Sequence, residues 1–238
     1  MIVRARPSVR VLVTGFGPFP GVPNNASASL VTALAQSVRM PGIELFAEVI
    51  PVKWADAGTA AHEAIARVEP HAILHFGVSK RVTGFEIEMR AFNASGPKKD
   101  HAGLSGPGRP LDRAGRPVLF ATMPPPVLLR ALRRGGFAAQ LSRNAGRYLC
   151  NALFYWSLAD AGYSGRLVSF IHIPMLDANA NAEQNFSLKD ATAGAHVLVR
   201  ASAQAVLFAR RSRSSPAITL KYDRGSQAIH RRASRRFP

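Results

Sequence analysis

Short apolar runs rich in β-branched residues recur along the first 210 residues, and most are separated by longer amphipathic stretches. Runs of this length and composition predict strands, and the first and last of those named here are expected to be buried. The four predicted strands are Val9–Thr14, Ile43–Val49, His71–Gly77 and Leu167–Ile173. The stretches Phe85–Asn93 and Ala138–Leu141 are expected to be extended as well.

Between these strands, apolar positions recur with the spacing of a helix face. The predicted helices are Ala26–Val38, Trp54–Val68, Pro124–Arg134, Arg147–Ala161 and Leu188–Arg210. Asn24 or Asn25 can cap the first of them, and Gly162 is expected to end the fourth. Strands that alternate with helices predict an α/β fold: a mainly parallel sheet with helices on both faces, an α/β/α sandwich in a single domain.

Length and composition agree with this architecture. The chain has 238 residues, of which 47% are hydrophobic, enough for one sizeable core. We assign residues 1–210 to the α/β domain and residues 211–238 to a basic, disordered C-terminal tail. Residues 209–238 contain nine Lys or Arg against one acidic residue, Asp223, and few periodic apolar positions.

The sequence also predicts where the protein resides. No apolar run approaches the roughly 18 residues of a membrane-spanning helix. The first ten residues carry three arginines without the apolar stretch of a signal peptide. We therefore expect a cytoplasmic protein that makes no membrane contact.

A stiff loop, Gly15-Phe-Gly-Pro-Phe-Pro-Gly21, follows the first strand. It differs from a dinucleotide-binding loop because its third glycine falls one place late and its prolines remove backbone donors. Phe16 and Phe19 on such a loop favour an apolar substrate pocket instead.

Cys150 is the only cysteine, so an internal disulfide and a multi-cysteine metal site are both excluded. It lies in the opening turns of a predicted helix, where free N–H groups and the helix dipole favour a thiolate and can stabilise an oxyanion. An inert buried thiol is the alternative interpretation.

A thiol nucleophile needs a base, and His172 at the end of a buried strand is a candidate. A carboxylate should then orient the imidazole. Glu86 and Glu88 both qualify, since residues two apart lie on the same face of a strand. Residue chemistry alone does not choose between them.

These segments together resemble the pyroglutamyl peptidases of type I, the pyrrolidone-carboxylate peptidases. The resemblance covers residues 11–210 and rests on four segments in the family's order. They are Val11-Leu-Val-Thr-Gly-Phe-Gly-Pro-Phe19, Glu88-Met-Arg-Ala-Phe-Asn93, Ala145-Gly-Arg-Tyr-Leu-Cys-Asn-Ala-Leu-Phe-Tyr155 and Phe170-Ile-His-Ile-Pro174. The second segment begins at the family's catalytic glutamate, which selects Glu88.

The resemblance implies a cysteine peptidase that removes an N-terminal pyroglutamyl residue from peptides with a blocked N-terminus. It implies Cys150, His172 and Glu88 as the catalytic residues and an acyl-enzyme intermediate. It implies no metal and no organic cofactor, and a homo-oligomer, since relatives are often tetramers. The implied substrate-binding positions are Phe16, Phe19, Val78, Asn93 and Lys98.

Two of these positions depart from the family. Val78 replaces a glutamine that contacts the lactam in relatives, within an altered loop, Gly77–Arg81. Lys98 replaces an arginine and keeps the charge without the planar fork. The segment after Pro174, Met-Leu-Asp-Ala-Asn, also differs.

Two other hypotheses remain open on the sequence alone. A non-catalytic or substrate-shifted protein on the same scaffold could bind a ligand through Phe16, Phe19 and the altered loop. Alternatively, the basic tail could contact nucleic acid independently of the domain.

Overall fold

A computed structural model describes residues 8–19, 21–37, 39–108, 110–176 and 186–214. The strands are β1 (Val9–Phe16), β2 (Ile43–Ile50), β3 (Ala72–Ser79), β4 (Phe85–Glu88), β5 (Arg90–Phe92), β6 (Val118–Phe120), β7 (Ala139–Ser142) and β8 (Leu167–Pro174). The helices are α1 (Ala26–Ala35), α2 (Ala57–Val68), α3 (Pro125–Arg134), α4 (Leu149–Ser164) and α5 (Leu188–Ser214). Among the described residues, no helix combines the length and apolar character that a bilayer crossing needs.

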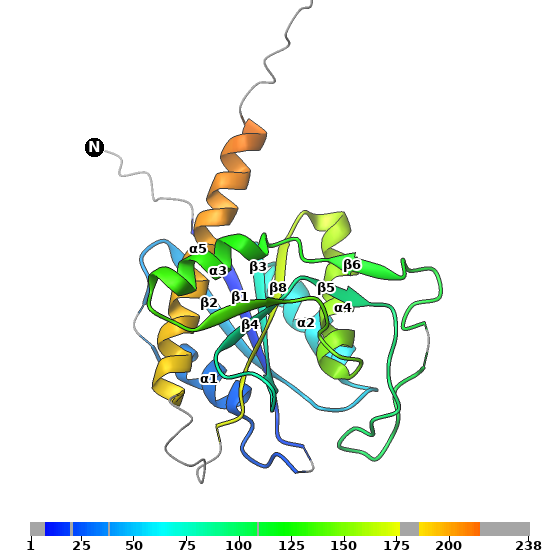
Figure 1. The fold of residues 1–238 in the computed structure, drawn as a ribbon. Helices are drawn as coiled ribbons and strands as arrows, with labels where there is room; N and C mark the ends of the chain where they lie inside the picture. Colours follow the sequence, from blue (N-terminus) through cyan, green and yellow to red (C-terminus); the bar gives the residue numbers. More distant parts are fainter. Residues whose placement is uncertain (1–7, 20, 38, 109, 177–185, 215–238) are drawn as a thin grey trace, which may run out of the picture.

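Six strands form one sheet in the order β2-β1-β3-β8-β4-β7. The first four are parallel to one another, β4 is antiparallel to β8, and β7 is parallel to β4. The short strands β5 and β6 form a separate antiparallel pair. The predicted α/β architecture is confirmed, with helices on both faces of a mostly parallel sheet (Figure 1).

Each face of the sheet has its own apolar core. Helices α1, α3 and α5 cover one face, where Val11, Leu74 and Ile171 point. Helices α2 and α4 cover the other, where Leu12 and Phe170 point. Side chains alternate between the two faces along each strand, so neighbouring residues of a strand belong to different cores. The candidate site residues lie on the face that α2 and α4 cover.

The turn from β1 into α1 is tight and depends on a glycine. A Cβ on Gly15 would lie 2.2 Å from the backbone oxygen of Ser27, so a side chain there would displace the helix. Asn25 caps the helix by accepting a hydrogen bond from the Ser27 N–H at 3.1 Å. This fixes where the loop with Phe16 and Phe19 stands relative to the sheet.

Several element bounds differ from the predicted ones. The extended stretch 85–93 breaks after Glu88, because β4 joins the large sheet and β5 pairs with β6. Helix α4 continues past Gly162 to Ser164, and Gly165, whose φ of 69° suits a left-handed conformation, is its C-cap. Helix α5 runs beyond Arg210 to Ser214. The division of the chain at residue 210 stays a prediction, and the tail from 215 on lies outside the described residues.

A buried polar network ties α4 to the middle of the sheet. His75 on β3 is fully buried, with Nδ1 2.7 Å from Thr14 Oγ1 and Nε2 2.9 Å from Ser157 Oγ. Burial lowers the pKa of His75 from 6.5 to about 3, so its imidazole is neutral at ordinary pH. A neutral imidazole can donate with one nitrogen and accept with the other, which satisfies both hydroxyls.

We expect His75→Ala to lower the free energy of unfolding by about 2–4 kcal/mol, since it leaves a cavity and two buried hydroxyls without partners. Urea unfolding measures the change. His62→Ala on the exposed side of α2 is the control and should shift stability by less than about 0.5 kcal/mol. Equal losses in the two variants would show that the network contributes nothing.

Candidate active site

The sulfur, imidazole and carboxylate that the sequence singled out come from three different elements. Cys150 is the second residue of α4, His172 lies near the carboxyl end of β8, and Glu88 is the last residue of β4. Residues 170 and 172 of β8 face α4, as do residues 86 and 88 of β4, because residues 85, 87, 171 and 173 belong to the opposite core. All three side chains therefore lie between the sheet and the start of α4.

Strand pairing places the carboxylate beside the imidazole. In the antiparallel pair β4–β8, Glu86 stands opposite His172 and Glu88 opposite Phe170. Glu88 Oε1 is 2.8 Å from His172 Nδ1, and the Glu88 side chain is completely buried. Its second oxygen, Oε2, is buried without a hydrogen-bond partner among the described residues, so His172 is the group that compensates the buried charge.

Glu86 has a different role in the structure. Its Oε2 accepts a hydrogen bond of 2.6 Å from Gln140 Nε2, and the residue is partly exposed. The choice between Glu86 and Glu88, which residue chemistry left open, is therefore made by geometry, since the hydrogen bond to the imidazole comes from Glu88.

The Cys150 sulfur lies over Gly77, which stands opposite His172 in the β3–β8 pair, and Cys150 contributes to the pKa of this imidazole. Since Glu88 occupies Nδ1, the ring nitrogen left for the sulfur is Nε2. Burial by itself lowers the pKa of His172, but its interactions with Cys150 and Glu88 raise it from 6.5 to about 10. The site therefore favours a protonated imidazole.

The surroundings of Cys150 suit a reactive thiol. The residue is neither fully buried nor fully exposed. Tyr148, the N-cap of α4, makes no side-chain cap hydrogen bond, so the first N–H groups of the helix are not satisfied by that side chain. A Cβ on Gly77 would lie 3.1 Å from the sulfur and 2.9 Å from the ring of Phe170. Any side chain larger than that of glycine at position 77 would therefore displace the sulfur or the Phe170 ring.

A small cavity of about 60 Å³ opens beside the sulfur. Four of the predicted substrate-binding residues line it: Phe16, Phe19, Val78 and Lys98. The sequence analysis missed Val52, Tyr148 and Leu149, which also line it. Their position in the chain could have indicated Tyr148 and Leu149, because residues directly before Cys150, at the start of the same helix, face the same space as its sulfur.

Asn93 lies elsewhere. Its amide donates hydrogen bonds to the backbone oxygens of Asp112 and Gly115 and accepts one from the Asp112 N–H. It does not line the cavity beside Cys150. In the structure, Asn93 holds the loop that precedes β6.

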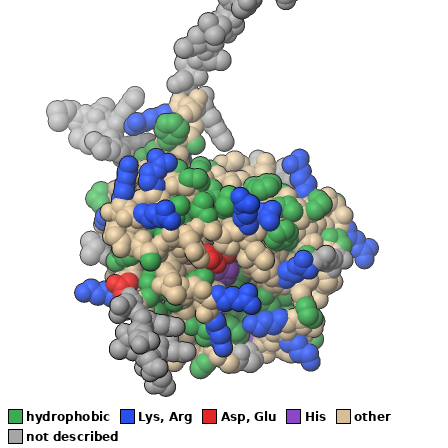
Figure 2. All heavy atoms as spheres, in the orientation of Figure 1, with side chains coloured by type: hydrophobic (Ala, Val, Ile, Leu, Met, Phe, Trp, Pro, Cys, Tyr) green, Lys and Arg blue, Asp and Glu red, His purple; other side chains and the backbone are tan. Residues whose placement is uncertain are grey.

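A metal site would need several carboxylate, imidazole or thiolate groups close together. In the described part of the chain one such group occurs, with ligand atoms within 4.8 Å of one another: Glu86, Glu88 and His172. Glu88 and His172 are already bonded to each other, and Glu86 to Gln140. We assign these atoms to hydrogen bonding rather than to a metal. Figure 2 shows acidic and histidine side chains at the base of a hollow in one face, with Lys and Arg side chains around it.

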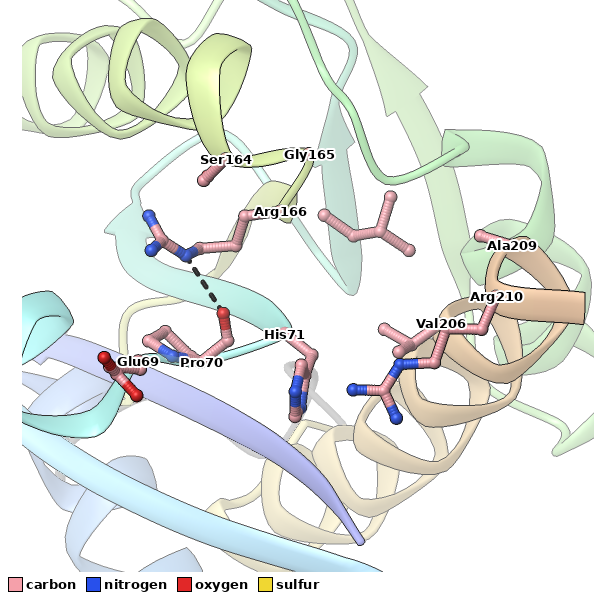
Figure 3. Close-up of a pocket in the computed structure, with 10 residues that line it drawn as sticks. Glu69, Pro70, His71, Ser164, Gly165, Arg166, Val206, Ala209 and Arg210 are labelled. Carbon is pink, nitrogen blue, oxygen red and sulfur yellow. Dashed lines mark hydrogen bonds between the residues drawn. The ribbon is translucent and has the colours of Figure 1, made fainter. Parts of the chain in front are cut away.

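A larger cavity, of about 290 Å³, lies at the opposite end of the sheet, where β3 and β8 begin (Figure 3). His71, Arg166 and Arg210 line it. Arg166 Nε donates to the Pro70 oxygen at 2.9 Å and its guanidinium pairs with Asp160, so this arginine joins the ends of α2 and α4. Cys150 does not line this cavity, which we regard as part of the scaffold.

Comparison with known proteins gives one consistent result. The model of the pyroglutamyl peptidase family matches residues 9–206. A pyrrolidone-carboxylate peptidase from Vibrio vulnificus is 31% identical over 180 residues, which is 75% of this chain and 84% of the relative. One from Pyrococcus furiosus is 28% identical over 171 residues, 71% of this chain and 82% of the relative.

Solved structures agree on the fold. Pyroglutamyl peptidase I from Bacillus amyloliquefaciens superposes with a TM-score of 0.76 at 24% identity, covering 82% of this chain and 95% of that one. The pyrrolidone carboxyl peptidase from Thermococcus litoralis has a TM-score of 0.77 at 21% identity, covering 85% and 96%. At these identities the structural likeness speaks for the fold alone.

We expect Glu88→Gln to slow alkylation of Cys150 by iodoacetamide about tenfold at pH 7.5 and to change it little at pH 9. Without the negative charge the pKa of His172 falls, so the imidazolium that favours the thiolate is lost at pH 7.5, whereas a cysteine ionises without it above about pH 8.5. Mass spectrometry of the labelled protein gives the rates. Glu86→Gln is the matched control and should stay within about twofold of wild type. Equal slowing by both substitutions would contradict the assignment of Glu88.

Proposed function

The chain belongs to the pyroglutamyl peptidase family and is a hydrolase of that kind, and we propose that it removes the N-terminal pyroglutamyl residue of peptides through Cys150, His172 and Glu88. The observation that carries the proposal is the hydrogen bond of 2.8 Å between His172 and the buried Glu88, with the Cys150 sulfur close enough to affect the pKa of the same imidazole. This is the arrangement that nucleophilic catalysis by a thiol requires: nucleophile, base and a group that orients the base.

In the first half of the reaction, the Cys150 sulfur attacks the carbonyl carbon of the pyroglutamyl residue. N–H groups at the start of α4 stabilise the oxyanion that forms. His172 then gives its Nε2 proton to the leaving amine nitrogen, the C–N bond breaks, and a thioester remains on Cys150. Glu88 keeps the imidazole in the orientation and tautomer that this proton transfer needs.

In the second half, His172 removes a proton from a water molecule, which attacks the thioester carbonyl. The C–S bond breaks, pyroglutamate leaves, and the thiolate and the imidazolium are restored. All groups that the cycle needs belong to the chain, so the mechanism invokes neither a metal nor an organic cofactor.

The apolar cavity beside the sulfur suits the ring of the substrate. We assign Phe16, Phe19 and Val78 to its walls, with Lys98 at its edge. A pyroglutamyl residue has no free amino group, so a pocket with mostly apolar walls does not need to accommodate an ammonium ion. Family membership and the Cys150–His172–Glu88 chain favour hydrolysis over a non-catalytic ligand-binding role.

Wild-type protein is expected to release aminomethylcoumarin from pyroglutamyl-aminomethylcoumarin, and Cys150→Ala to lower kcat/KM at least about 1000-fold, because the nucleophile is removed. Fluorescence of the released coumarin follows the reaction. Glu86→Gln, outside the triad, should keep most of the activity. Absence of turnover by the wild-type protein would refute the proposed substrate.

We expect Gly77→Ala to lower kcat/KM about 10- to 100-fold with the fold retained, because the added methyl group displaces the sulfur from its line with His172. Steady-state kinetics and a thermal unfolding curve are the two measurements. Gly162→Ala, on the same helix as Cys150 and with open space at its Cβ, is the control for a glycine substitution. Full activity in Gly77→Ala would show that the sulfur tolerates movement.

A further inference from the structure

Lys98 carries a positive charge at the cavity beside Cys150. Its Nζ lies 5.2 Å from the ring centroid of Phe19 and 4.6 Å from that of Tyr148. All three side chains line the cavity. Two aromatic faces attract the same ammonium, so it stays at the cavity although the lysine itself is exposed.

The backbone on both sides of Lys98 is anchored. Gly96 N–H donates to the Arg147 oxygen at 2.6 Å, three residues before Cys150. Buried Asp100 accepts hydrogen bonds from the N–H groups of Trp54, Ala102 and Leu104, with distances of 2.7, 2.8 and 2.9 Å. The loop therefore holds Lys98 at the cavity from two directions.

The other polar side chains of the lining are already committed. The Asn25 amide donates to the Gly17 oxygen and accepts from Ser27. The Tyr148 hydroxyl donates to the Lys99 oxygen at 3.1 Å. Phe16, Val52, Val78 and Leu149 offer no side-chain hydrogen-bonding group.

Lys98 differs from these residues. Within the described ranges, its ammonium has contacts with the two rings and no hydrogen-bond or ion-pair partner. An ammonium has three donors and no acceptor, so a ligand group that pairs with it must be an acceptor. The ring carbonyl oxygen of a pyroglutamyl group is such an acceptor.

We propose that Lys98 is a specificity-determining residue, whose ammonium donates a hydrogen bond to the ring carbonyl oxygen of the pyroglutamyl group. The inference rests on the proposed function for its substrate and adds how the substrate is recognised. The cavity then selects a five-membered ring by its lactam oxygen as well as by its shape. A protonated N-terminal proline, which places a cation in the same ring, is disfavoured by the like charge.

The test compares two dipeptides that differ only in the lactam: pyroglutamyl-alanine and cyclopentanecarbonyl-alanine. Binding is measured by titration calorimetry with full-length Cys150→Ser protein, which cannot form the thioester. We expect pyroglutamyl-alanine to bind more tightly. Adding Lys98→Met should raise its dissociation constant about 10- to 100-fold and leave that of the carbocyclic peptide within about threefold.

Two further variants serve as controls. Lys98→Arg keeps the charge and donors and should retain the preference for the lactam. Lys99→Met removes the same charge from the neighbouring residue, whose side chain does not line the cavity, and should leave both dissociation constants unchanged. If the Lys98→Met protein still prefers the lactam peptide, or if the substitution raises both dissociation constants equally, the proposal is wrong.

Turnover by protein with intact Cys150 separates this inference from the proposed function. If Lys98→Met lowers kcat equally for coumarin substrates with either ring and leaves peptide binding unchanged, Lys98 acts on the oxyanion and the inference fails. If the chain binds the lactam through Lys98 but never hydrolyses it, the inference stands and the proposed function fails.

Discussion

The buried hydrogen bond between Glu88 and His172 is the interaction on which the site depends. A carboxylate with no solvent exposure is costly unless a cation or a donor compensates it, and His172 is the compensating group in the structure. The same bond holds Nδ1, directs Nε2 to Cys150 and contributes to the raised pKa of the imidazole. A single contact thus joins β4 to β8 and helps set the pKa of the imidazole.

The antiparallel placement of β4 makes this contact available. In a sheet whose central strands are parallel, β4 runs backwards against β8 and delivers its last residue beside the imidazole. Helix α4 brings the sulfur from above the same face, and the hydrogen bonds of His75 to Thr14 and Ser157 join this helix to β1 and β3. Reacting groups on packed strands and a helix keep their geometry better than groups on loops.

The cavity beside the sulfur is built differently. Phe19, Tyr148 and Lys98 come from segments outside the strands, and the loop of Lys98 depends on anchors such as Asp100. Loops change residues more readily than a packed core does. In this chain an apolar wall stands at position 78 of the cavity, and a cation held against two rings stands at position 98.

The sequence by itself predicted the α/β class, four of the strands and the candidate thiol and imidazole, because these follow from local periodicity and residue chemistry. It favoured Glu88 over Glu86 only through a resemblance to a family. It did not separate β4 from β5, because the sequence of one extended stretch does not show that its two halves pair with different strands. Its assignment of Asn93 as a substrate residue stays a prediction, since the structure shows only that the amide holds a loop, and it overlooked Tyr148. Strand register, the face on which a side chain stands and the ring pair around Lys98 join residues far apart in the chain, so only the tertiary structure decided them.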